Sequence, residues 1–161
     1  MTSTTLERRI RILLSVFIIG LVLSGATAIP LETEVRLLLR MTAMADRAGL
    51  APPGLVRWLV AVREALVDVN ARYPFIAYGT DWLAFGHFVI AVAFIGPLRE
   101  PVKNVWVVEF GMIACVLLVP FALGMGAVRG IPVGWRLVDC SFGVCGIVPL
   151  WLCWRYIRIL T

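Results

Sequence analysis

The chain's single histidine, His87, lies in a stretch that is otherwise typical of the hydrocarbon core of a membrane. It follows Asp81 by six residues in the segment Tyr78–Phe88, which opens with polar and aromatic side chains and continues as an apolar run. Burying an ionisable side chain in such a run is costly unless it faces a partner. We therefore treat His87 as the first candidate for a functional site.

Further ionisable residues flank the start of the last apolar run. Asp139 lies one helical turn after Arg136. At a helical rise of about 1.5 Å per residue, His87 lies roughly 9 Å beyond Asp81, and Asp139 reaches a similar depth in its own segment. Because charged groups at such depth usually face the protein interior and pair, we expect one polar intramembrane cluster. Its expected members are Asp81, His87, Arg129, Arg136 and Asp139.

Two roles compete for His87. Its imidazole could form a hydrogen bond with Asp139 or with a backbone carbonyl, as buried polar groups normally do. It could instead be an axial ligand of haem iron or chlorin magnesium. A single histidine cannot supply both axial ligands of a haem within one chain, and adding Asp139 and Cys140 leaves a zinc site incomplete. A pentacoordinate pigment on His87, or a site completed by a partner, is still an alternative, so the cofactor is unknown, and no other metal site is predicted.

Glu109 is a separate intramembrane carboxylate. It lies about a turn and a half beyond Asn104, and the nearest cations in the sequence are Arg99 and Lys103. One expectation is a shallow ion pair that anchors the helix. The alternative is a proton-coupled carboxylate of a small transporter, for which a second acid at the same level is missing.

Ser141, His87 and Asp139 together have the residue types of a catalytic triad. However, no GxSxG nucleophile elbow surrounds Ser141, and no phosphate-binding loop, HExxH or EF-hand pattern occurs. No catalytic residue is assigned from the sequence, and an enzyme is the third functional alternative.

The composition indicates a membrane protein. Hydrophobic residues make up 61% of the 161 residues, against roughly 45–50% in soluble domains. The net charge of +5 comes from basic residues that flank apolar runs, which favours contact with anionic lipid over nucleic acid. The lipid bilayer is thus the first expected partner, and no nucleic-acid partner is expected.

Four transmembrane helices are predicted, at about 12–30, 82–98, 104–128 and 133–154, in an all-α fold. The first run also resembles a secretory signal peptide, with a basic head and the ending Ala26-Thr27-Ala28. Its 19 uncharged residues (12–30) are long enough to span, so we expect a retained span. Pro120 is expected to kink the third span.

An amphipathic helical hairpin is predicted over about 31–72, between the first two spans. Each of its helices has an apolar stripe and a charged face, and Asp68 and Arg72 are spaced for an ion pair. The connection falls at Ala51-Pro52-Pro53-Gly54. The hairpin is expected to lie on the membrane or to cap the helices, so that 1–161 form one integral membrane domain with an interfacial part at 31–79.

Four spans place both termini on one side. The short segments on that side carry most of the basic residues outside the hairpin: Arg8, Arg9, Arg11, Arg99, Lys103, Arg155 and Arg158. Short cytoplasmic segments collect Lys and Arg. We therefore expect a bacterial inner-membrane protein with cytoplasmic termini and a periplasmic hairpin.

Two classes of function fit best. The first is a non-catalytic accessory or assembly subunit of a larger membrane complex, associating with other membrane subunits or with itself through small residues such as Gly143 and Gly146. The alternative is a ligand-binding protein or small carrier for haem, chlorin, quinone or a polar solute, using an outer-side cluster of His87, Asp139 and Arg136. The ligand, the partner, the oligomeric state and any direction of transport do not follow from the sequence.

Overall fold

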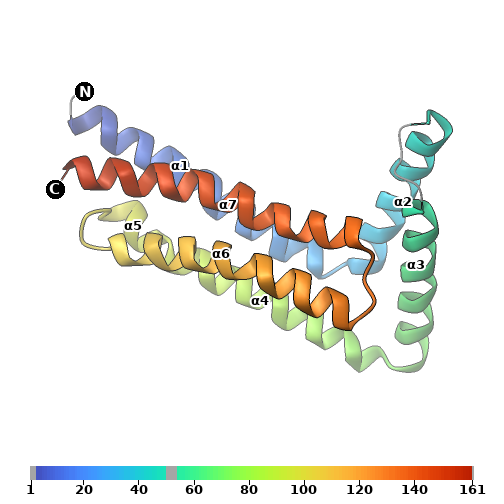
Figure 1. The fold of residues 1–161 in the computed structure, drawn as a ribbon. Coiled ribbons are helices and arrows are strands. Elements are labelled where there is room, and N and C mark those ends of the chain that lie inside the picture. The colour runs from blue at the N-terminus through green and yellow to red at the C-terminus, as the bar shows by residue number, and fades with distance from the viewer. Residues whose placement is uncertain (1–2, 50–53, 161) are drawn as a thin grey trace. The chain divides into compact units, whose positions relative to one another are not determined.

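The computed structural model describes residues 3–49 and 54–160, and every regular element in these residues is a helix (Figure 1). The all-helical class predicted from the apolar runs is confirmed. In chain order the elements are α1 (Ser3–Ala28), α2 (Leu31–Arg47), α3 (Leu55–Arg72), the 3-10 helix η1 (Pro74–Ala77), α4 (Tyr78–Ala93), α5 (Ile95–Arg99), α6 (Val105–Val128) and α7 (Val133–Leu160).

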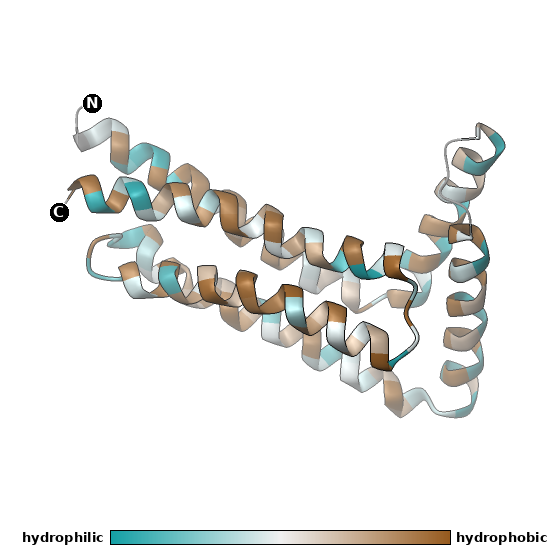
Figure 2. Ribbon diagram, in the orientation of Figure 1, coloured by the Kyte–Doolittle hydropathy of each residue, from teal (hydrophilic) through white to brown (hydrophobic). Residues whose placement is uncertain are grey.

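Four stretches of helix are long and apolar enough to cross a membrane, and each overlaps one of the expected spans. They are Thr4–Ala28, Pro74–Arg99, Val105–Val128 and Val133–Leu160. Figure 2 shows mostly hydrophobic residues along the middle of α6, and hydrophilic residues near the chain ends of α1 and α7.

The first and last helices extend beyond their apolar runs. α1 begins at Ser3 rather than near residue 12, so Arg8, Arg9 and Arg11 are helical. α7 continues to Leu160 rather than ending near residue 154. Arginine is a good helix former, and neither extension contains a glycine or proline. The uncharged run marks a span, whereas the helix itself continues through charged residues.

The second span is interrupted at Phe94, between α4 and α5. Pro97 has no N–H group, so the carbonyl of Ala93 lacks the donor that a continuous helix would supply. On either side the helical bonds persist, from Phe94 N to Ile90 O and from Leu98 N to Phe94 O, both at 3.2 Å. The sequence-based boundaries missed this interruption.

The chain divides into two compact units, which we describe separately. The first comprises residues 1–21 and 89–161, and the second comprises residues 22–88. The single membrane domain expected over the whole chain stays a prediction.

The core of the first unit joins α1, α6 and α7 around Phe94. The ring of Phe17 packs on Phe94, with ring centres 4.7 Å apart. In lipid, such packing stabilises through close van der Waals contact rather than through removal of apolar surface from water. The buried members are Ile10, Leu14, Phe94, Val107, Val108, Leu150, Cys153 and Ile157.

α6 and α7 lie side by side (Figure 1), and their backbones come close at Gly143. A Cβ atom added to Gly143 would lie 2.6 Å from the backbone carbonyl oxygen of Cys115. One added to Gly146 would lie 2.9 Å from the sulfur of the same cysteine. Small residues permit this approach of two backbones in a membrane.

The second unit contains α2 and α3, which contact each other. Asn70 Nδ2 donates a hydrogen bond to Glu32 Oε2 across the pair, at 3.4 Å. The predicted ion pair of Asp68 and Arg72 is confirmed, with Oδ1 and Nε 2.8 Å apart. Residues 50–53, which hold most of the expected connection, lie outside the described residues.

Candidate functional site

His87 is held by a hydrogen bond within its own helix. Its Nδ1 lies 2.8 Å from the carbonyl oxygen of Leu83, one turn earlier on α4. A carbonyl oxygen can only accept, so Nδ1 is the donor in this bond. In the neutral tautomer that has its proton on Nδ1, Nε2 has a free lone pair, which is the arrangement found when an imidazole binds a metal or accepts a hydrogen bond. A backbone carbonyl was one of the two partners expected for this side chain.

His87 also lies where α1 and α4 come together within the second unit. A Cβ atom added to Gly25 would meet Phe88 Cε1 at 2.8 Å, and Ala84 O and His87 Cβ at 3.0 Å. Gly25 is buried and His87 is half-buried. The base of the histidine side chain therefore forms part of a helix contact that requires a glycine opposite.

Asp81 occupies the first turn of α4, and its side chain is exposed. A carboxylate there is stabilised by the partial positive charge of the helix N-terminus. Within its unit and among the described residues, it has no hydrogen-bond or ion-pair partner.

Arg136 closes the turn between α6 and α7. Gly130, with φ of 68°, donates to Ala127 O at 3.2 Å, and Ile131 N donates to Gly126 O at 2.8 Å. These two bonds form a Schellman motif at the end of α6. The Nε atom of Arg136 then donates to Ile131 O at 2.7 Å.

Gly126 is required because the Arg136 side chain lies across it. A Cβ atom at that position would be 2.6 Å from Arg136 Cδ and 2.7 Å from Cγ. Part of the Arg136 side chain therefore has a structural role in the turn between α6 and α7. Gly130 is the second requirement, because positive φ disfavours any residue with a side chain.

Arg129 and Asp139 make no such contact. Arg129 caps the C-terminal end of α6 and is exposed, while Asp139 is half-buried on α7. No hydrogen bond or ion pair joins the side chain of either residue to a described residue of the same unit. Asp139 and Arg136 are one turn apart on α7 without forming an ion pair.

The expected cluster thus falls on both units. Asp81 and His87 belong to residues 22–88, and Arg129, Arg136 and Asp139 belong to the other unit. Within each unit the cluster residues do not pair with one another. The cluster across all five residues stays a prediction. Arg136 could take part in it only through its Nη groups, because its Nε group donates to Ile131 O.

The best-formed intramembrane polar group in the described residues surrounds Glu109. Its Oε1 accepts a hydrogen bond from Trp154 Nε1 at 2.9 Å and lies 3.3 Å from Arg158 Nη2. The Arg158 guanidinium also lies over the Trp154 ring, 5.1 Å from its centre. These contacts join α6 to α7.

Sequence reasoning missed both contacts of Glu109. It considered only Arg99 and Lys103, because they are near in the chain. The available signal was the spacing of Trp154 and Arg158, which are four residues apart and so share one helix face. With one carboxylate bound by an indole and a guanidinium, this group acts as a structural link between two helices.

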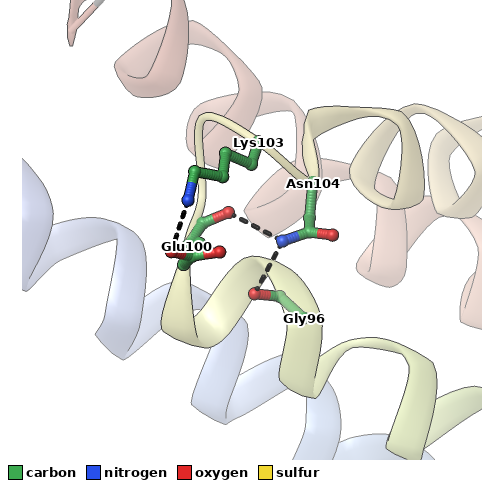
Figure 3. Close-up of polar contacts among 4 residues, drawn as sticks. All are labelled: Gly96, Glu100, Lys103 and Asn104. Atoms are coloured by element: carbon green, nitrogen blue, oxygen red, sulfur yellow. Dashed lines mark hydrogen bonds and ion pairs between the residues drawn. The ribbon is translucent and has the colours of Figure 1, made fainter.

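The connection between α5 and α6 is held by a compact set of polar contacts (Figure 3). Asn104 Nδ2 donates to Gly96 O at 3.3 Å and to Glu100 O at 3.0 Å, satisfying carbonyls at the end of α5. Lys103 Nζ lies 2.8 Å from Glu100 Oε1. This hydrogen bond and the carboxylate charge raise the pKa of Lys103 above its ordinary value.

Ser141 Oγ donates to the carbonyl of Val138 at 2.6 Å, so its hydroxyl proton is used within its own helix. No three His, Cys, Asp or Glu side chains in the described part of the chain are grouped so as to hold a metal ion.

Comparisons of the chain with protein-family models, with curated proteins and with solved structures gave no match.

Proposed function

We propose that this protein is a non-catalytic accessory or assembly subunit of a membrane complex in a bacterial inner membrane. The contact with its partner is made by α2, through three apolar side chains that we name the Leu/Met stripe: Leu37, Met41 and Met44. Their spacing places them on one face of the helix. This stripe is the observation that carries the proposal.

The Leu/Met stripe is exposed on a helix that is not among the candidate spans. Leu37 is 58% exposed, Met41 60% and Met44 71%. Apolar patches that remain exposed outside hydrocarbon mark interaction surfaces. Covering a Leu or Met side chain contributes about 1.5–3 kcal/mol, and Met adapts to varied partner surfaces.

The charges beside the stripe select the kind of partner. Arg36, Arg40 and Arg47 lie on the adjoining face of α2, and all three are exposed. An apolar stripe bordered by guanidinium groups is complementary to a partner helix with an apolar face and an acidic edge. The amphipathic α2–α3 hairpin would thus present a specific surface to another subunit.

Topology is part of the proposal: both termini in the cytoplasm and the hairpin in the periplasm. In support, basic residues gather at one end of the first unit. Arg11, Arg99 and Lys103 line one cavity there, and Arg9 lies over the Tyr156 ring, 6.0 Å from its centre. By the positive-inside rule this end is cytoplasmic. Periplasmic alkaline phosphatase fused to either terminus should be inactive, and activity would contradict this orientation.

Photo-crosslinking in the native membrane tests the partner. A photoreactive amino acid is placed at Met41, and a control is placed at Arg63, which is exposed on α3. We expect a discrete protein adduct from position 41 and none from position 63. Met41→Glu should disperse the complex in mild detergent, whereas Met41→Leu should preserve it. Lipid adducts alone from position 41 would refute the proposal, because the hairpin would then rest on the bilayer.

A second candidate is the binding of a haem, chlorin, quinone or polar solute through His87. The supporting observation is the Nδ1 bond to Leu83, which leaves Nε2 able to ligate or accept. A visible absorption spectrum of the purified protein tests the pigment forms of this candidate. A stoichiometric chromophore that is lost in His87→Ala would favour it over the subunit proposal.

A further inference from the structure

At the end of the first unit that holds the chain termini, basic side chains surround a cavity of about 390 Å³. We name it the headgroup cavity. It is lined by Glu7 and Arg11 of α1, by Arg99, Glu100, Pro101, Val102 and Lys103 at the α5–α6 connection, and by Leu160 of α7. Residues from three parts of the chain thus converge on one polar space.

Two of its cations are not neutralised by the protein. Lys103 pairs with Glu100 at 2.8 Å. The side chains of Arg11 and Arg99 form no hydrogen bond or ion pair with any described residue of this unit. Counting the lining charges, three cations face two carboxylates, and after the Lys103–Glu100 pair two guanidinium groups face only Glu7. The cavity therefore favours an anion.

Arg99 ends α5, and the connection that follows it is held in place by contacts within the protein. Asn104 binds the carbonyls of Gly96 and Glu100, and Lys103 binds the Glu100 side chain (Figure 3). Pro97 and Pro101 further restrict the backbone on either side of Arg99. A site of this kind loses little conformational entropy when it binds.

An open depression of about 540 Å³ runs along one face of α1. It shares Glu7 and Arg11 with the headgroup cavity, and the rest of its lining is Thr4, Arg8, Ile12, Ser15, Val16 and Ile19. The apolar members are exposed, with Ile12 at 53%, Val16 at 58% and Ile19 at 57%. We name this surface the α1 groove. It leads from a cationic pocket into the apolar part of the first span.

The geometry points to a binding site for one anionic phospholipid. Arg11 and Arg99 hold the phosphodiester in the headgroup cavity, and an acyl chain lies in the α1 groove against Ile12, Val16 and Ile19. Guanidinium groups bind phosphate oxygens in a bidentate manner, which suits this assignment. The inference is independent of the subunit proposal, because it uses neither α2 nor any partner protein.

Native mass spectrometry of the delipidated protein in detergent, titrated with defined lipids, tests the site. Phosphatidylglycerol is the anionic probe, phosphatidylcholine the zwitterionic one, and glycerol 3-phosphate the soluble one. We expect a one-to-one complex with phosphatidylglycerol, weaker binding of phosphatidylcholine and no retained glycerol 3-phosphate. Equal binding of the two lipids, or equal competition by glycerol 3-phosphate, would overturn the proposal.

Matched variants distinguish a specific lipid site from non-specific electrostatic attraction of anionic lipid to basic residues. Arg11→Gln and Arg99→Gln should each lower the affinity for phosphatidylglycerol about fivefold, the effect typical of one basic residue near an anionic surface. Arg155→Gln removes the same charge at the same end, but Arg155 lies over the Trp151 ring and not in the cavity. It should leave the affinity unchanged. Equal losses in all three variants would refute the site.

The α1 groove is tested without altering charge. Val16→Trp should fill the groove and weaken lipid retention, whereas Ile113→Trp, at a position 60% exposed on α6, should not. If Arg99→Gln fails to give a helical, monodisperse protein, Arg99→Lys replaces it. This variant keeps the charge but loses the bidentate geometry, so it should bind less tightly than the native protein. Unchanged binding in Val16→Trp and Arg99→Lys would overturn the assignment.

Discussion

Replacing Gly143 with alanine should destabilise the packing of α6 against α7. The new Cβ atom would lie 2.6 Å from the Cys115 carbonyl oxygen and 3.5 Å from its carbonyl carbon. An ordinary carbon–oxygen contact needs about 3.3–3.6 Å, so the backbones must separate by roughly 0.7–1 Å. Because the clashing atom belongs to the backbone, no rotamer change relieves it.

The magnitude follows from three terms. Overpacking costs about 1–3 kcal/mol. A gap of 0.5–1 Å forfeits roughly a quarter to a half of the van der Waals attraction between each pair of atoms affected, which adds about 1 kcal/mol over the contact. The higher helix propensity of alanine offsets about 0.5–1 kcal/mol of this loss. We therefore expect Gly143→Ala to lower the free energy of unfolding by about 1–3 kcal/mol.

Other glycines of the same helices supply the controls. A Cβ at Gly124 or Gly134 meets nothing within 4 Å, so alanine there should leave stability unchanged or raise it by up to about 1 kcal/mol. The atoms nearest to a Cβ at Gly111 belong to buried side chains, with Phe94 Cζ at 2.6 Å and Leu150 Cδ1 at 2.9 Å, and a side chain can give way more than a backbone carbonyl can. Gly111→Ala should therefore give an intermediate loss.

Reversible unfolding in mixed micelles of a mild detergent and dodecyl sulfate, followed by circular dichroism, measures these differences. The reasoning predicts an order of stability in which Gly134→Ala exceeds Gly111→Ala, and Gly111→Ala exceeds Gly143→Ala. If Gly143→Ala is as stable as Gly134→Ala, the close approach of α6 and α7 at Cys115 is wrong.

Three further perturbations test other contacts. Glu109→Ala removes the acceptor of Trp154 and the partner of Arg158, so the free energy of unfolding in mixed micelles should fall by about 1–2 kcal/mol. Arg158→Ala should lower it by less than about 1 kcal/mol, because the ion pair is partly exposed. Burial raises the pKa of Glu34, with a partial offset from the Thr27 hydroxyl, so the folded state binds this proton more tightly than the unfolded state. Stability relative to Glu34→Gln should therefore fall as pH rises through and above the ordinary value of 4.5, and a difference independent of pH in thermal unfolding would contradict this. If the protein is an accessory subunit without a pigment, the purified native protein and the purified His87→Ala variant should both lack visible absorption.

The positions of the four long helices could be predicted from the sequence, because long runs of mostly apolar residues are typical of membrane-spanning helices. Their ends could not. Arg8, Arg9 and Arg11 belong to α1, because charged residues end the part of a helix that can lie in hydrocarbon but do not end the helix itself. The interruption at Phe94 was foreseeable from Pro97, whose missing N–H acts four residues earlier.

The side-chain contacts were harder to predict than the helices. Glu109 binds Trp154 and Arg158, which are more than 40 residues away, and nothing in chain proximity indicates that choice. Arg136 was assigned to a polar cluster from its depth alone. Its bond to Ile131 depends on the Schellman turn and on the space left by Gly126, and neither can be inferred from helical rise.

The first-unit core has a consequence for the order of biosynthesis. Ile10 and Leu14 pack with Leu150 and Ile157, so α1 depends on a helix that is synthesised much later. Leu150 follows Ile10 by 140 residues, which take roughly 7–28 s to translate at about 5–20 residues per second. During that interval α1 has no α7 to cover it, and lipid, insertion factors or another nascent protein must occupy its contact face. Ribosomes that stall before α7 should therefore leave α1 accessible to such factors, and synthesis of α7 should release them.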